Sequence, residues 1–296
     1  MKTQPFQRSV QFVFWCVFVS MFAISCGKTA LDPNKLSEKT PLHSIDTVKY
    51  QWDDLSTDRG ATSDIITYDN AGKIGGVTST NVAGLPATIL FTYQGNKVTL
   101  NTAFKDEYDL DAAGRVILHI ATHAEDPTFV FKNEEHYSYD NNGYLSDIIM
   151  TINGITYSFN TTVSRINYTV QNGNYISYTL ADSTNTVFTR KYDFIYTAAK
   201  ASVPVSFFVP IFGDNTFIAV EKYLNFGKQS LNLLSGVNFS VWKEDGSTQT
   251  GSLIASHQLN AQGNIASITL SGPFISGQPL DNLSPIPRYI SFSYNK

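Results

Sequence analysis

Tyr139-Asp140-Asn141-Asn142-Gly143-Tyr144-Leu145 contains a turn that this chain uses four times. The other copies are Asp69-Asn70-Ala71-Gly72, Asp111-Ala112-Ala113-Gly114 and Asn260-Ala261-Gln262-Gly263, each followed after one residue by an aliphatic side chain. Asp or Asn at the first position and Gly at the fourth favour a type I turn. With the glycine in the left-handed region, such a turn closes a β-hairpin through a bulge. We therefore expect an antiparallel β fold in which four turn glycines have a structural role: Gly72, Gly114, Gly143 and Gly263.

Segments of alternating apolar and polar residues lie between these turns. Thr88–Tyr93 and Ile166–Val170 are examples, and Asn153-Gly154 is a strong signal for a two-residue hairpin turn. Such segments predict an all-β domain, an antiparallel meander of hairpins that forms a curved sheet or a barrel-like domain. The alternation breaks between about residues 198 and 234, where an apolar run with prolines leaves the structure open.

The first 25 residues have the layout of a signal peptide. An apolar run from about Phe12 to Ile24 is too short for a membrane span and leads directly into Ser25-Cys26. A small residue before a cysteine is what the signal peptidase of bacterial lipoproteins requires, so we predict that Cys26 is lipidated. Cys16 would leave with the signal, and the mature chain could then form no internal disulfide. An ordinary cleaved signal peptide and an uncleaved anchor are the alternatives.

The predicted signal peptide and Cys26 divide the chain into three parts. Residues 26–45 are polar and contain two prolines, which is typical of a flexible tether. We predict a lipoprotein signal peptide at 1–25, a tether at 26–45 and a single all-β domain at 46–296. Lipidation would hold the protein on a membrane of the bacterial cell envelope, and we expect the outer membrane, with the leaflet left open.

Bulk composition narrows the class of partner. Only 16% of the residues are charged and the formal net charge is −4, so no basic patch suggests a nucleic-acid partner. Aromatic residues make up 13% of the chain, enough for a sizeable core. The membrane, reached through Cys26, is the one partner that the sequence predicts.

Two segments of the sequence resemble known protein families. Tyr68-Asp69-Asn70-Ala71-Gly72-Lys73-Ile74 resembles YD repeats, which build β shells, although the glycines here are unevenly spaced. Tyr223–Leu234, with its Phe-Gly-Lys-x-Ser-x-Asn-Leu stretch, together with the cysteine motif and the meander, resembles a Bacteroidetes-type lipoprotein family of unknown function. That resemblance implies a porin-like all-β domain over residues 46–296, and it implies no catalytic residues.

No group of residues predicts a particular reaction. His119 and His123 are four apart and would share one face of a strand, yet solvated histidines explain them better than a metal site. Asp106 and Glu107 are neighbours, and in a strand they would point to opposite faces. There is no Gly-x-Ser-x-Gly motif and no phosphate-binding glycine loop. We predict neither a metal nor another cofactor.

These observations favour a lipid-anchored envelope protein that is not an enzyme. The leading hypothesis is a binding or scaffold module for a glycan, lipid or protein partner. Tyr175 and Tyr178 belong to a group of aromatics that could line such a site, although alternating tyrosines are more often the half-buried face of a sheet. The alternatives are an envelope glycan hydrolase with distant paired carboxylates and a small transmembrane β-barrel.

Overall fold

A computed structural model describes the β domain. Of the chain, it describes residues 45–51, 62–80, 86–102, 105–126, 129–154, 159–182, 188–200, 223–242, 246–272 and 289–294. The predicted signal peptide, Cys26 and the tether lie outside these residues. Within them, no helix is long and apolar enough to cross a membrane.

Sixteen antiparallel strands form one closed barrel. The first eight are β1 (Ile45–Gln51), β2 (Thr62–Tyr68), β3 (Ile74–Thr80), β4 (Pro86–Gln94), β5 (Lys97–Leu100), β6 (Lys105–Leu110), β7 (Val116–Asp126) and β8 (Phe129–Tyr139). The others are β9 (Leu145–Gly154), β10 (Phe159–Gln171), β11 (Asn174–Asp182), β12 (Phe188–Lys200), β13 (Asn232–Trp242), β14 (Thr248–Leu259), β15 (Ile265–Ser271) and β16 (Tyr289–Tyr294). The prediction of an all-β meander of hairpins is confirmed, and the meander is closed.

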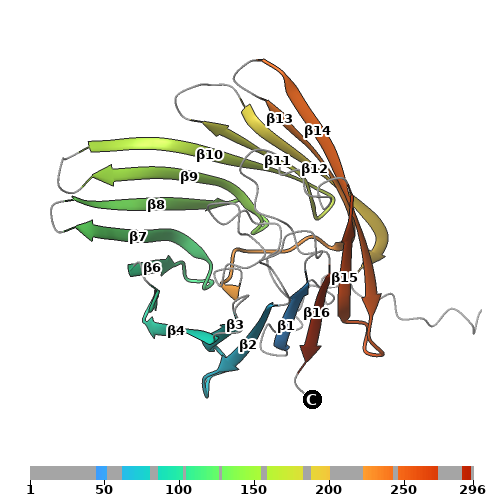
Figure 1. Ribbon diagram of the computed structural model, residues 1–296, viewed down its shortest axis with the longest axis horizontal. Helices are drawn as coiled ribbons and strands as arrows, with labels where there is room; N and C mark the ends of the chain where they lie inside the picture. Colours follow the sequence, from blue (N-terminus) through green and yellow to red (C-terminus); the bar gives the residue numbers. More distant parts are fainter. Residues whose placement is uncertain are drawn as a thin grey trace, which may run out of the picture. The chain divides into compact units, whose positions relative to one another are not determined.

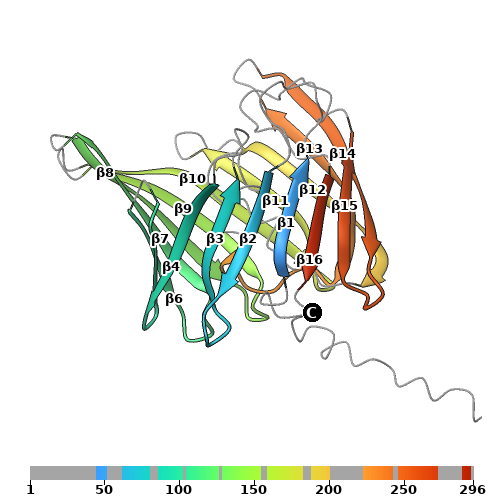
Figure 2. The same ribbon diagram turned by 60° about the horizontal axis from the view of Figure 1, so that its bottom comes forward.

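Each strand pairs with its neighbours in sequence, and the first strand pairs with the last (Figure 1). At this closure Tyr50 lies opposite Ile290 and Val48 lies opposite Phe292. Figure 2 shows β1 and β16 side by side. The wall therefore has no unpaired edge among these sixteen strands.

The four Asp/Asn-x-x-Gly turns share one geometry. At Asp140 the carbonyl accepts the Gly143 N–H at 3.0 Å, and the carboxylate accepts the N–H groups of Asn142 and Tyr144 at 2.9 Å each. The same bonds recur at the other three turns, whose strands each show a register shift at the turn. The glycines have φ between 74° and 86°, a region that costs other residues energy. Local chemistry alone therefore builds four of the hairpins.

One predicted turn is displaced. Asn153 and Gly154 belong to β9, where they pair with Asn160 and Phe159 of β10. β9 and β10 do form a hairpin, but Asn153 and Gly154 are paired residues of β9 rather than its turn. Register with the neighbouring strands overrides the local preference of Asn-Gly for a tight turn.

The inner wall of the barrel is mostly apolar and forms one core. Val48 and Tyr50 are buried, while Lys49 between them is exposed. Because successive side chains of a strand point to opposite faces, the buried set is the inner face. It forms a single cluster that includes residues of both ends of the sequence, such as Ile45 and Phe292.

The outer wall carries charged side chains on part of its circumference. Ion pairs there join Lys97 to Asp109 at 3.1 Å, Arg165 to Asp147 at 2.8 Å and Lys191 to Asp193 at 2.9 Å. Surface pairs of this kind stabilise a fold little.

Candidate functional site

A segment between β12 and β13 is bound to the ends of three hairpins. We call Tyr223–Leu231 the inner segment. Its Asn225 carbonyl accepts the N–H of Val116 at 2.9 Å, and its Lys228 N–H donates to the Gly143 carbonyl at 3.0 Å. Leu231 N–H donates to the Gly173 carbonyl at 3.0 Å. These partners lie on the β6–β7, β8–β9 and β10–β11 hairpins. The inner segment therefore connects three hairpin ends on one rim of the barrel by backbone hydrogen bonds.

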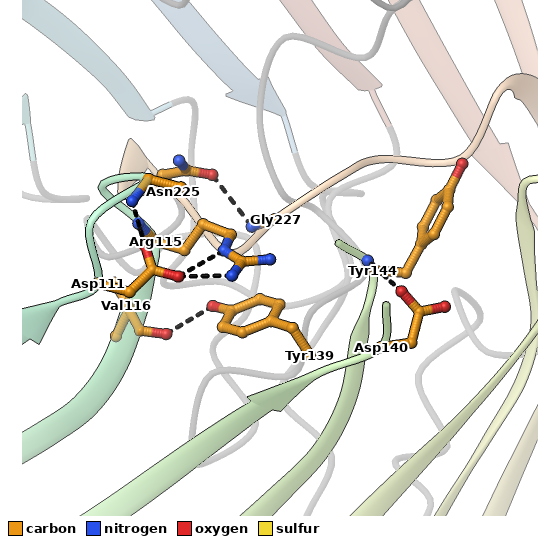
Figure 3. A network of polar contacts seen from close by, with 9 residues as sticks. Asp111, Arg115, Val116, Tyr139, Asp140, Tyr144, Asn225 and Gly227 are labelled. Carbon is orange, nitrogen blue, oxygen red and sulfur yellow. Dashed lines mark hydrogen bonds and ion pairs between the residues drawn. The ribbon is translucent and has the colours of Figure 1, made fainter. Parts of the chain in front are cut away.

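The inner segment requires glycine at position 227. Gly227 has φ of 87°, and a Cβ there would lie 2.6 Å from the Gly143 carbonyl oxygen and 2.9 Å from the Tyr139 ring. The Asn225 side chain accepts the Gly227 N–H at 3.0 Å (Figure 3). The backbone is thus held within contact distance of the β8–β9 turn, which a side chain would prevent.

Arg115 and Tyr139 surround this contact. The Arg115 guanidinium pairs with Asp111 at 2.6 Å and lies 4.3 Å from the centre of the Tyr139 ring (Figure 3). The Tyr139 hydroxyl donates to the Val116 carbonyl at 2.5 Å. Hydrogen bonds from Arg115 and the charge of its guanidinium outweigh burial and lower the pKa of Asp111. These contacts fix the rim rather than expose a reactive group.

The far end of the inner segment is held by a buried carboxylate on β2. Asp64 is 4% exposed, and its oxygens accept the hydroxyls of Tyr223 at 2.7 Å, Ser79 at 2.6 Å and Tyr50 at 3.1 Å. Burial and the nearby Asp64 charge raise the pKa of Tyr50 well above its usual value, so this hydroxyl keeps its proton and donates. A charged carboxylate with hydroxyl donors is a strong anchor in a low-dielectric interior.

A second buried group is made of Asp106, His119 and Glu135. They lie on the neighbouring strands β6, β7 and β8, where His119 is directly opposite Glu135 in register and diagonal to Asp106. The His119 Nε2 lies 2.9 Å from an Asp106 oxygen, and Nδ1 lies 3.3 Å from a Glu135 oxygen. All three side chains are less than 10% exposed. We call them the Asp-His-Glu group.

The electrostatics of this group make His119 a cation. Burial alone would lower its pKa, but the hydrogen bonds and negative charges of Asp106 and Glu135 outweigh burial and raise the pKa from 6.5 to about 9. The Tyr108 ring stacks on the imidazole at 4.3 Å, and the Tyr137 hydroxyl donates to Glu135. Stacking on a cationic ring is favourable because the aromatic face is negative.

The Asp-His-Glu group is in contact with the inner segment through one aromatic pair. The rings of Tyr137 and Phe226 have centres 5.2 Å apart, and Phe226 is completely buried. A charge group on the wall and a segment distant in sequence are therefore parts of the same packed interior.

The chemistry open to this group is limited. Both ring nitrogens of His119 already bind carboxylates, which leaves no lone pair for a metal. Among the described side chains, no set of three His, Cys, Asp or Glu residues could hold a metal ion. The side chain of His123 lies outside the described residues, so its role stays a prediction. Asp106 and Glu135 are two buried carboxylates on one wall, as a glycan hydrolase would need. However, the His119 imidazole occupies the space between them where a substrate would have to bind.

An aromatic row crosses the inner wall further along the barrel. Tyr168, Tyr178, Tyr192 and Phe239 lie opposite one another on β10 to β13, followed by Gly251 on β14. The Tyr178 and Tyr192 rings stack at 4.4 Å, and Phe239 lies over the space that a Gly251 side chain would fill. Because the Tyr192 ring covers one face of the Tyr178 ring, that face packs within the wall rather than forming a sugar-stacking surface.

Comparisons with known proteins bear on the fold of this chain. No family model matches the chain, and no curated protein matches it. Among solved structures, a porin-like protein from Bacteroides uniformis ATCC 8492 is similar, with a TM-score of 0.59 and 11% identity over 85% of this chain and 96% of that one. A porin-like protein from Bacteroides vulgatus ATCC 8482 gives 0.56 and 14%, over 85% of this chain and 98% of that one. At these identities the likeness concerns the fold.

The resemblance proposed from the sequence is therefore supported in its structural part. The neighbours are porin-like barrels, as the Phe-Gly-Lys stretch and the meander implied. Membership of the lipoprotein family and the similarity to YD repeats remain predictions. Sequence reasoning placed Asp106 and Glu107 on opposite faces, and Glu107 does pair outward with Lys105 at 2.9 Å. It did not pair Glu135 with His119, because no local signal in the sequence links the two residues.

Proposed function

We propose that this chain is a lipid-anchored protein of the bacterial cell envelope whose barrel is a non-conducting binding or scaffold module. Cys26 would carry the lipid, and the tether at 26–45 would join it to the barrel. The observation that carries the proposal is the polarity of the wall, with apolar side chains inside and ion pairs outside.

This polarity is the reverse of that of a membrane pore. A transmembrane barrel presents an apolar band to lipid and a polar lumen to water. Here Val98 and Leu100 point inward and are buried, while Lys97 and Asp109 pair outside. A strand of four residues, such as β5, is also much shorter than the nine to eleven or so that cross a bilayer.

The interior also argues against conduction. A barrel of about sixteen strands has room for an aqueous channel. In this barrel the inner segment occupies part of that room, since Phe226 is fully buried and Tyr223 reaches Asp64 across the interior. A module with a packed interior offers its rim or its outer wall to a partner.

Two measurements test the proposal. Cells that express the full chain are labelled with radioactive palmitate, and we expect the label to be incorporated and to be lost in Cys26→Ala. The purified full chain is then added to planar bilayers, and we expect no conductance steps. Incorporation that survives Cys26→Ala contradicts the anchor, whereas steady single-channel steps contradict the non-conducting barrel.

A transmembrane β-barrel is the second candidate. It is favoured by the porin-like description of both structural neighbours and by the absence of charged residues from six of the strands, β3, β4 and β13 to β16. It predicts that the Cys26→Ala chain stays in the membrane fraction after a carbonate wash. The proposal of a water-facing barrel predicts that this variant is released into the soluble fraction.

A further inference from the structure

The sequence contains three Asn-Gly pairs, and the fold places each in a different backbone environment. Asn142-Gly143 lies in the β8–β9 turn, Asn153-Gly154 forms the last two positions of β9, and Asn172-Gly173 connects β10 to β11. An asparagine before glycine is the one that loses its side-chain amide most readily, because glycine has no Cβ to obstruct attack by its nitrogen. The backbone around each pair therefore determines which of them reacts.

The reaction joins two groups that are neighbours along the chain. The glycine nitrogen gives its proton to hydroxide and bonds to Cγ of the asparagine, the Cγ–Nδ2 bond breaks, and the amide leaves as ammonia with a proton from water. A second water opens the five-membered ring at either carbonyl, which leaves aspartate or isoaspartate. The ring closes where Cβ of the asparagine eclipses the next nitrogen, at a ψ of about −120°, which is also the ψ of the first central residue of a type II′ turn.

Asn172-Gly173 is one peptide rotation away from this geometry. The φ values of 51° and 77°, with Gln171 paired to Asn174, make it a two-residue type I′ turn. Rotation of the peptide plane between the two residues converts type I′ into type II′ and leaves the positive φ of Asn172 unchanged. Glycine readily adopts the new φ of about −80°. Both turn types suit the twist of a hairpin, so the reactive form needs no separation of the strands.

This peptide is held weakly. Within the part of the chain that the structure describes, the Gly173 N–H donates no hydrogen bond. The Asn172 carbonyl, at the other end of the same peptide, accepts the Asn174 side-chain amide at 3.4 Å, which is long for a hydrogen bond. The Asn172 side chain is exposed, so hydroxide and water reach it. The peptide is therefore free to rotate, and its nitrogen is free to react.

The other two pairs are restrained. The Gly143 N–H donates to the Asp140 carbonyl at 3.0 Å, and this bond closes the β8–β9 turn, so rotation of its peptide breaks the turn. Gly154 is paired with Phe131 on β8 and with Phe159 on β10, so neighbouring strands hold its backbone from both sides. These pairs are internal controls for the one between β10 and β11.

The reactive turn is also one of the contacts of the inner segment. The Gly173 carbonyl accepts the Leu231 N–H at 3.0 Å and the Tyr144 hydroxyl at 3.3 Å. The approach is close, since a Cβ on Gly173 would lie 2.4 Å from the Leu231 side chain. Isoaspartate carries the main chain through its β-carbon and so adds one methylene to the backbone directly before Gly173. In a two-residue turn, displacement of Gly173 and its carbonyl has to accommodate the added length.

We propose that Asn172 is a site of spontaneous deamidation, and that isoaspartate at this position releases the Leu231 end of the inner segment from the β10–β11 turn. Because ammonia is lost, the change accumulates with the age of the folded protein. Old molecules then differ from new ones in the rim that the inner segment connects. The inference does not depend on the proposed lipid anchor or on a partner.

The rate of the reaction tests the site. The purified full chain is kept for weeks in neutral and in mildly alkaline buffer, and peptide mass spectrometry measures conversion of Asn142, Asn153 and Asn172. The same is done in guanidinium chloride, where the three pairs should react at similar rates. Folding should slow Asn142 and Asn153 at least several-fold and Asn172 much less, and the rate at Asn172 should rise with pH. Slowing of Asn172 as strong as at the other two overturns the proposed site.

Hydrogen exchange at the Leu231 amide tests the release. In aged protein converted at position 172, this amide should exchange several-fold faster than in fresh protein. Asn172→Gly is the matched control, because glycine keeps the positive φ and has no amide to lose, so its exchange should not change with age. Asn172→Asp carries the charge without the added methylene and should exchange like fresh wild type. Unchanged exchange in converted protein, or an equal increase in aged Asn172→Gly or in Asn172→Asp, overturns the release.

Discussion

The stability of the barrel should depend on pH through His119. In the folded protein this imidazole lies between the carboxylates of Asp106 and Glu135, which together raise its pKa to about 9. In the unfolded chain its pKa returns to about 6.5. Between these two values the folded state binds one more proton than the unfolded state, so the free energy of unfolding falls as pH rises.

The size of the effect follows from the two pKa values. A pKa that rises from 6.5 to about 9 corresponds to about 3 kcal/mol of stability. This contribution is complete below pH 6.5, declines as pH rises, and is lost above about pH 9, where His119 is neutral in both states. For a domain with a typical stability of about 5–15 kcal/mol, such a loss is large.

Urea unfolding followed by circular dichroism at several pH values between 6 and 9.5 measures the decline. We expect His119→Gln to be less stable than wild type near pH 6 and to lack most of this decline. His136→Gln is the matched control, because the His136 side chain is 52% exposed and faces water. An equal decline in wild type and His119→Gln, or an NMR titration that places the pKa of His119 at or below 6.5, would refute the reasoning.

Two further substitutions probe the inner segment. Gly227→Ala should lower the free energy of unfolding by about 2–4 kcal/mol, because a φ of 87° is strained for alanine and the Cβ would meet the Gly143 carbonyl. Gly246→Ala is the control. Gly246 has a φ of 81° and open space around it, so this substitution should cost only about 1 kcal/mol. Denaturant midpoints compare the two, and equal losses would contradict the contact. Tyr223→Phe removes the 2.7 Å hydrogen bond to Asp64 and should cost about 1–3 kcal/mol, whereas Tyr289→Phe on the outer wall should change stability by less than about 0.5 kcal/mol. A neutral Tyr223→Phe would show that Asp64 does not hold the inner segment.

The features of the fold that depend on local chemistry could be predicted from the sequence. Asp140 and Gly143 determine their turn through hydrogen bonds that span four residues, so the pattern is readable without knowledge of the rest of the chain. The Asn153-Gly154 prediction was wrong because strand register, a property of the whole sheet, keeps both residues paired within β9. Closure of the barrel depends on pairing between β1 and β16, which no local pattern reports.

The contacts of the candidate site could not be predicted from the sequence, because they too depend on strand register. The sequence pattern links His119 to His123, whereas the partners of His119 are Glu135, directly opposite it, and Asp106, diagonal to it, as the register of three strands requires. The Phe-Gly-Lys stretch is distinctive in the sequence, but the sequence alone does not show its physical cause. Its cause is the contact between Gly227 and the β8–β9 turn, which joins residues far apart in the chain.

The pairing of the first strand with the last has a consequence for how the protein folds. β16 (Tyr289–Tyr294) is the last of the sixteen strands in sequence order, and until it pairs, β1 and β15 each present an open row of backbone donors and acceptors. Closure between the two ends of the domain is a late and entropically costly step, so folding should be slow for a domain of this size. The folding chain would then need protection from edge-to-edge aggregation during that interval, and deletion of these six residues would leave both strand edges permanently open.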